Sequence, residues 1–271
     1  MKKILVATDG SEPAQAAVGW SAGFVEAMHA KAVVATVIEP AESELGSAGQ
    51  RRAIAHRLEQ EWTGPLRTRG LDHESVVGEG DPRTGLLEMA STGDIDTVVV
   101  GTRGAGGFAG LGVGSVPHYL ARHLPCPLIA VPGPGGPLAG GTVVVGVDGS
   151  PANANAVRWA VSTAEVLGGE LVAVFVHSPL ADVMTHTAAN WQYPGEEAVR
   201  QELALAGAAD PRLERVAGNP VEELNRIAAE EHAGLVVVGR RGRGGVHGLV
   251  LGRVPAQVLH HTVGPVVVVP H

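Results

Sequence analysis

The second half of this chain repeats the first, and that repeat limits what the chain can fold into. Residues 3–11 read KILVATDGS and residues 142–150 read TVVVGVDGS. Further on, GDP at 80–82 corresponds to GNP at 218–220, and VVVG at 98–101 recurs at 236–239. The glycines at 104, 106, 107, 110 and 114 then align without a gap with those at 242, 244, 245, 248 and 252. Chance does not align so many glycines. The chain is therefore a tandem duplication, and one fold must serve both halves.

A linker separates the two halves. Residues 132–141 read PGPGGPLAGG, and proline and glycine without periodicity are typical of a linker. We place the boundary near residue 137, which gives domains 1–136 and 137–271, each of ordinary size. The chain is 45% hydrophobic and 18% charged, so each half has enough apolar side chains to form a packed core.

Strand and helix patterns alternate along the first half. We predict strands over residues 3–7, 32–38, 71–77, 95–100 and 128–131, and helices over 11–29, 50–69, 82–91 and 115–123. Continuous apolar strands separated by helices indicate a parallel sheet covered on both faces. Right-handed crossovers then favour a doubly wound fold. The predicted fold class is α/β, with two repeated doubly wound domains, each a five-stranded parallel sheet of order 3-2-1-4-5.

The fold class predicts where a ligand would bind. In doubly wound sheets, ligands bind beyond the carboxyl ends of the strands, where the winding direction reverses. With the order 3-2-1-4-5, this point lies between the first and fourth strands. Asp9 follows the first strand and a glycine-rich loop follows the fourth. Two independent patterns thus indicate the same crevice.

The glycine-rich loop is suited to an anion. It reads Gly101-Thr-Arg-Gly104, then nine residues, then Gly114-Ser115, where a helix is predicted to begin. Glycines let backbone amides approach phosphate oxygens and tolerate a positive φ, which we expect at Gly114. The amides and dipole of the helix N-terminus favour an anion, and the Ser115 hydroxyl can donate one more hydrogen bond. The second loop has the same spacing, but Arg253 follows its last glycine, Gly252.

These motifs together resemble the universal stress protein family. The resemblance rests on G-x-x-G-x(9)-G-[S/T] after the fourth strand and on TDGS or VDGS after the first, and it covers essentially the whole chain, twice. It implies that each half binds ATP, with or without magnesium. It also implies that Asp9 and Asp148 lie beside the ribose and adenine, and that backbone groups at Val37 and Val176 contact adenine.

The residues expected to bind ATP form two matched sets. Those of the first half are Ala7, Asp9, Val37, Gly101, Arg103, Gly104, Gly107, Gly114, Ser115 and Val116. Those of the second half are Gly146, Asp148, Val176, Gly239, Arg241, Gly242, Gly245, Gly252, Arg253 and Val254. Arg103 and Arg241 either screen phosphate charge or are solvated surface arginines. Arg253 either swings out, leaving a weaker site, or pairs with the triphosphate.

Several enzyme classes do not fit this sequence. A P-loop needs a lysine, and all three lysines lie within the first 31 residues, away from both loops. No G-x-G-x-x-G follows the first strand, which excludes a Rossmann dinucleotide site. Neither half offers a second carboxylate at a readable spacing from Asp9 or Asp148 to hold magnesium and position water. We expect a nucleotide-binding regulatory protein and no enzyme, or at most a slow ATPase; a slow phosphotransfer enzyme and a dimerisation scaffold with relic loops are the alternatives.

Charge and hydropathy bear on partners and location. The net charge of −8 argues against nucleic acid, and no apolar run approaches the ~20 residues of a membrane helix. No signal peptide is visible, so a cytoplasmic protein is expected. The resemblance implies that the fifth strands associate, making the two halves an internal pseudo-dimer; homodimerisation is left open. The sequence names no downstream protein partner.

Overall fold

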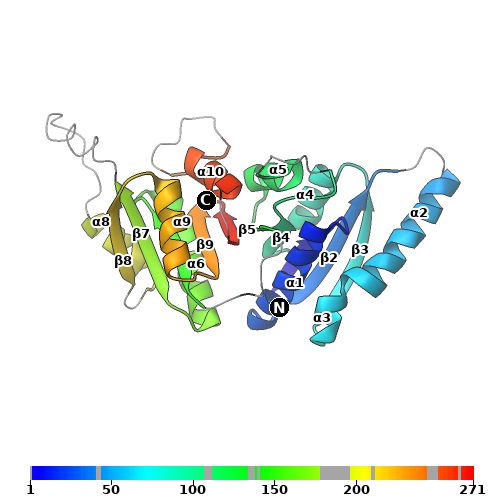
Figure 1. Ribbon diagram of the computed structural model, residues 1–271, viewed down its shortest axis with the longest axis horizontal. Coiled ribbons are helices and arrows are strands. Elements are labelled where there is room, and N and C mark those ends of the chain that lie inside the picture. The colour runs from blue at the N-terminus through cyan, green and yellow to red at the C-terminus, as the bar shows by residue number, and fades with distance from the viewer. Residues whose placement is uncertain are drawn as a thin grey trace. The chain divides into compact units, whose positions relative to one another are not determined.

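The computed structural model divides the chain into two compact units, Met1–Leu138 and Ala139–His271 (Figure 1). It describes residues 2–40, 44–106, 112–133, 138, 141–177, 196–208, 211–242, 250–261 and 264–271, with the backbone alone at 44–47 and 196–197. The division falls next to the boundary expected near residue 137, although residue 137 itself lies outside the described part. Each unit is taken separately below.

The first unit is a doubly wound α/β domain. Its parallel sheet has the order β3-β2-β1-β4-β5, so the winding reverses beside β1. Helices α1 and α3 pack together against the sheet, and α4 and α5 pack together on the other face, as right-handed crossovers leaving β1 in both directions require (Figure 1). The elements are β1 (Lys3–Ala7), α1 (Glu12–Ala27), β2 (Lys31–Ile38), α2 (Glu44–Arg57), a π-helical turn (Leu58–Trp62), α3 (Gly64–Thr68), β3 (His73–Glu79), α4 (Pro82–Thr92), β4 (Thr97–Gly101), α5 (Ser115–His123) and β5 (Leu128–Val131).

The second unit repeats this architecture. Its strands are also parallel, in the order β8-β7-β6-β9-β10, so β6 takes the place of β1. The elements are β6 (Val143–Val147), a 3-10 turn (Pro151–Asn153), α6 (Ala154–Leu167), β7 (Leu171–His177), α8 (Glu196–Leu205), β8 (Arg212–Ala217), α9 (Pro220–Glu230), β9 (Leu235–Gly239), α10 (Arg253–His261) and β10 (Val266–Val269). The predicted fold class, a pair of doubly wound α/β domains, is confirmed.

The core lies on the central strands. Every residue of β4 and of β9 is buried, as expected for strands covered on both faces, whereas no residue of the outer strand β3 is fully buried. The predicted strand over 71–77 is observed two residues further along, at His73–Glu79. The helix predicted over 50–69 is interrupted, because Pro65 lies in the first turn of α3 and cannot continue the preceding helical hydrogen bonds.

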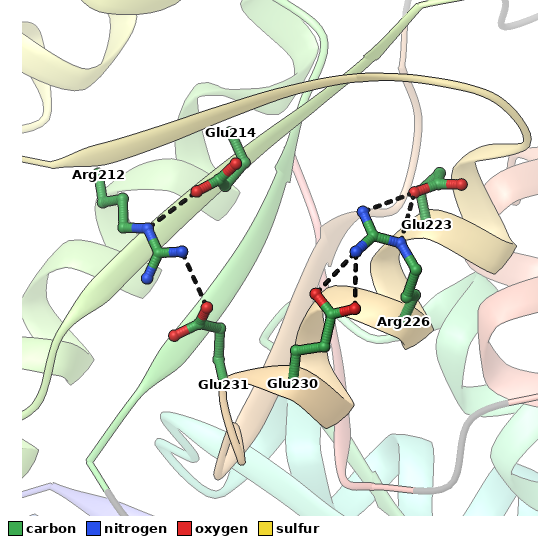
Figure 2. Close-up of polar contacts among 6 residues, drawn as sticks. All are labelled: Arg212, Glu214, Glu223, Arg226, Glu230 and Glu231. Carbon is green, nitrogen blue, oxygen red and sulfur yellow. Dashed lines mark hydrogen bonds and ion pairs between the residues drawn. The ribbon is translucent and has the colours of Figure 1, made fainter.

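Ion pairs lie on the outer strand and on helix α9 of the second unit. Arg212 on β8 donates to Glu214 and pairs with Glu231, each at 2.9 Å, and Arg226 on α9 joins Glu223 and Glu230 (Figure 2). The Arg212 and Arg226 side chains are 44% and 46% exposed, so the pairs contribute little stability. Charged residues on an outer strand instead oppose pairing with a strand of another molecule.

The strand register brings both predicted motifs to one edge of the sheet. Strand β1 pairs with β2 on one side and β4 on the other, and all three run in the same direction. Beyond Ala7, the amide of Thr8 donates to the Ala35 carbonyl at 2.9 Å, which extends the β1–β2 pairing by one residue. Asp9 therefore lies where the loop after Gly101 begins.

Candidate functional site

A cavity of about 410 Å³ opens in the first unit at the carboxyl ends of β1, β2 and β4. The first turn of α5 forms part of its wall. The residues predicted for this half line the cavity, except Gly107, which lies outside the described residues. The predicted residues in the lining are Ala7, Asp9, Val37, Gly101, Arg103, Gly104, Gly114, Ser115 and Val116.

The second unit has a matching cavity of about 610 Å³. It lies at the ends of β6, β7 and β9 and against the first turn of α10. Of the residues predicted for this half, Gly245 lies outside the described residues. The others all line the cavity: Gly146, Asp148, Val176, Gly239, Arg241, Gly242, Gly252, Arg253 and Val254.

One wall of each cavity was not predicted from the sequence. Pro82 and Leu86 of α4 line the first cavity, and Gly218, Asn219 and the start of α9 line the second. The repeat matches GDP at 80–82 with GNP at 218–220, but this match by itself predicts no ligand contact for those residues. Their position follows from the fold, since β3 and β8 end at the same edge of the sheet as the other strands. Leu86, Val100 and Val113 make this side of the first cavity apolar.

Asp9 connects the turn after β1 to the glycine-rich loop. Its Oδ1 accepts hydrogen bonds from the amide of Ser11 at 3.0 Å and from the Ser11 hydroxyl at 2.5 Å. Its Oδ2 accepts one from the amide of Ala105 at 2.7 Å. Ser11 therefore stands at the N-cap position of α1 but uses its hydroxyl on Asp9. Hydrogen bonds to a carboxylate are strong, so Asp9 holds the beginning of the loop in place.

The second glycine of each G-x-x-G lets this aspartate approach. A Cβ at Gly104 would lie 2.5 Å from Oδ2 of Asp9, and one at Gly242 would be closer still to Oδ2 of Asp148. The first glycine of each motif is also enclosed: a Cβ at Gly101 would lie 3.0 Å from the carbonyl oxygens of Pro13 and Arg103. These glycines are thus required by protein contacts before any ligand is considered.

The expectation of a positive φ at Gly114 is wrong. Gly114 has φ −72° and ψ 168°, and a Cβ there would meet no atom closer than 3.5 Å. Its amide donates to the Thr102 carbonyl at 2.7 Å, and the Gly252 amide donates to the Arg240 carbonyl at 2.9 Å. The glycine before each helix therefore closes the loop and does not offer its own amide to an anion.

Among the described residues at the start of each helix, the first two have amides that remain for an anion. These are Ser115 and Val116 in α5, and Arg253 and Val254 in α10. Amides in the first turn of a helix have no partner within the helix. The third residue of each helix is a proline, Pro117 or Pro255, which has no N–H to donate.

The turn after β1 and the turn after β6 have different neighbours. Trp62 is 5% exposed, and its ring occupies the space into which a Cβ at Gly10 would project. In the second unit the carboxylate of Glu202 on α8 is buried, and burial followed by the charge of Asp148 raises the pKa of Glu202 to about 7. The second half therefore does contain a second carboxylate within electrostatic reach of its aspartate, which the sequence spacing did not reveal.

Two features are absent from the described residues. Within those residues, no group of three or more histidine, cysteine, aspartate or glutamate side chains is placed to hold a metal ion. Nor is any helix of the described chain long and apolar enough to span a bilayer.

Fold and site together define a class of protein. Both units are doubly wound α/β domains with a cavity at the point where the winding reverses, and in each an aspartate packs against a glycine-rich loop that leads into a helix. The sequence model of the universal stress protein family matches residues 1–132 and 141–270, so the chain belongs to this family and contains two tandem copies of its domain.

Individual relatives agree with this assignment. The universal stress protein Rv1996 of Mycobacterium tuberculosis is 28% identical over 306 residues, which covers 98% of this chain and 94% of the relative. Universal stress protein Rv2005c of the same organism is 32% identical over 231 residues, covering 80% of this chain and 74% of the relative. The crystal structure of a universal stress protein from Archaeoglobus fulgidus superposes with a TM-score of 0.78 at 20% identity, covering 99% of this chain and 98% of that one, which supports the fold.

Proposed function

We propose that both halves bind ATP, with or without magnesium, and that occupancy tunes the protein's conformation or its partner binding in a stress response. One observation carries this proposal: each cavity is lined by an aspartate, by apolar side chains and by the first two residues of a helix. Both volumes, about 410 and 610 Å³, fall in the range of roughly 300–1,000 Å³ typical of small-molecule sites.

The three parts of the cavity suit the three parts of a nucleotide. Leu86, Val100 and Val37 offer an apolar surface for the base. Asp9 offers carboxylate oxygens that accept hydrogen bonds from ribose hydroxyls. The amides of Ser115 and Val116 meet phosphate oxygens at the positive end of α5.

The same aspartate provides a route from occupancy to conformation. Oδ2 of Asp9 accepts the hydrogen bond of the Ala105 amide at 2.7 Å. A ribose hydroxyl that donates to this carboxylate shares or replaces that bond, and the beginning of the glycine-rich loop then shifts. We propose that the loop after β4 is the surface through which a partner senses the nucleotide.

The nucleotide content of the purified protein tests this proposal. We expect denaturation followed by chromatography to release adenine nucleotide, and calorimetric titration of the emptied protein to give a stoichiometry of two. Asp9→Ala should weaken one site and Asp148→Ala the other. A protein that carries no nucleotide and ignores millimolar ATP would contradict the proposal and favour a scaffold with relic loops.

Slow hydrolysis of ATP in the second half is a second candidate function. It is favoured by Glu202, whose pKa of about 7 suits a general base and which lies near enough to Asp148 for their charges to interact, although Glu202 is not in the described lining of the cavity. Multiple-turnover phosphate release that is lost in Glu202→Gln, while ATP still binds, would support it. Unchanged release in that variant would leave binding as the function.

The remaining expectations about partners stay predictions. They are association of the two halves through β5 and β10, homodimerisation of the whole chain, a cytoplasmic location and the lack of a nucleic acid partner. An isolated half that stays monomeric and soluble at high concentration would contradict the first of these.

A further inference from the structure

The two cavities differ in charge. Arg103 and Asp9 are the charged residues in the described lining of the first cavity, whereas Arg241, Arg253 and Asp148 line the second. Arg253 is the first residue of α10, where Ser115 stands in α5. The second cavity therefore carries one more positive charge at the end where a phosphate would lie.

Further cations lie at the beginning of the second glycine-rich loop. Arg240 stands where the first loop has Thr102, and burial together with the charge of Arg241 lowers the pKa of the Arg240 guanidinium. Burial and then Arg241 and Arg240 lower the pKa of His271 as well. The Nε of Arg241 is buried and has no hydrogen-bond partner in the described part of the chain.

Arg253 adds a further positive charge to the lining of the same cavity. A cation at the N-terminus of a helix is unfavourable, because the free amides there already carry partial positive charge. The described lining of the second cavity thus holds two arginines and one aspartate, and an anion with several negative charges would balance the excess positive charge. The second cavity is also larger, at about 610 Å³ against 410 Å³, which leaves space for a longer phosphate chain.

We infer that the second cavity selects its nucleotide by the number of phosphates, preferring a triphosphate over a monophosphate by a larger factor than the first cavity does. The inference rests on the proposed function. Arginine binds phosphate oxygens through paired, charge-assisted hydrogen bonds, whereas the Ser115 hydroxyl gives one neutral donor. Each phosphate added to the ligand should therefore increase the affinity more in the second cavity than in the first.

The experiment measures AMP, ADP and ATP binding to one cavity at a time in the full chain. Val116 and Val254 are part-exposed second residues of α5 and α10, and both line their cavities. Val116→Trp should obstruct the first cavity and Val254→Trp the second, with circular dichroism to verify that each variant is folded. Calorimetry at fixed ionic strength then gives the ratio of the AMP to the ATP dissociation constant for the open cavity.

We expect this ratio to be about tenfold larger in the second cavity, the effect of one charged hydrogen bond. Arg253→Ser should lower the ratio there, and Ser115→Arg should raise it in the first cavity. Arg226→Ser is the matched control, because it removes the same charge from an exposed site on α9 that does not line the cavity.

Two results would overturn the inference. Equal ratios in the two cavities, or a ratio unchanged by Arg253→Ser, would overturn it while leaving nucleotide binding intact. A second cavity that binds none of the three nucleotides would overturn both the inference and the proposed function of that half.

Discussion

The two halves have the same strand order around their cavities but differ in the side chains that line them. Gly104 and Gly242 stand at matching positions because each is packed against a carboxylate oxygen of its own aspartate. The first residue of the next helix is exposed in each half, and there the halves differ as Ser115 and Arg253. The comparison teaches that glycines required by a close contact with the aspartate are the same in both halves, whereas exposed side chains at the start of the helix differ.

A second difference lies beneath the turns after β1 and β6. In the first unit the ring of Trp62 covers the turn. The Cζ of Arg57 lies 5.0 Å from the centroid of this ring. The second unit has the part-buried acid Glu202 near its turn. The first turn is thus held by apolar packing, while the second contains a group that titrates near neutral pH.

The largest expected effect comes from Trp62→Ala. Removing a large buried aromatic side chain costs about 3–5 kcal/mol of stability. Denaturant unfolding followed by circular dichroism should show this loss, and Glu202→Ala should cost much less, because its side chain is a desolvated carboxylate. Equal losses for the two variants would show that the turns are supported in the same way.

Gly104→Ala should come next. The added Cβ must displace Asp9, and the hydrogen bond from Ala105 is lost with it, so we expect about a tenfold loss of ATP affinity at the first cavity. Gly114→Ala is the matched control: its φ is negative and its Cβ meets only ordinary contacts, so its affinity should stay near the wild-type value. A large loss for Gly114→Ala and none for Gly104→Ala would reverse our account of the loop.

Glu202→Gln should change how stability depends on pH. The pKa of Glu202 is about 7 in the folded chain against an ordinary value of 4.5, so the folded state holds a proton that the unfolded state releases. This contribution is present below pH 4.5 and is lost as the pH rises through 7. Melting temperatures of the wild type should therefore fall more than those of Glu202→Gln between pH 5 and 8. Equal falls in the melting temperatures of the two proteins would contradict this prediction. Glu165→Gln, at an exposed position, serves as the control.

The smallest effects are expected from the ion pairs of the outer strands. Arg212→Ala removes the partner of Glu231 and Glu214 in the second unit, and Lys31→Ala removes the partner of Glu74, at 3.3 Å, in the first. Both should shift the denaturation midpoint only slightly, and less in high salt, because solvated charges are screened. A salt-insensitive loss would indicate that packing of the side-chain stems matters more than charge.

The sequence by itself determined the fold class, the duplication and most of the cavity lining. Helical spacing, apolar runs and turn residues are local properties of the chain, so they can be read without knowing what packs against them. The ends of the strands were predicted less accurately. The strand predicted over 95–100 is observed at Thr97–Gly101, because pairing with β1 and β5 sets where β4 begins and ends.

Only the tertiary structure decided what each glycine and acid contacts. The glycine-rich pattern predicts that Gly104 leaves space for phosphate. In the structure Gly104 leaves space for the carboxylate of Asp9, which is 95 residues earlier in the chain. For the same reason, Glu202 lies within electrostatic reach of Asp148, and Pro82 lines the first cavity. A parallel sheet brings the ends of strands that are distant in sequence to one edge, and no local pattern records which side chains then become neighbours.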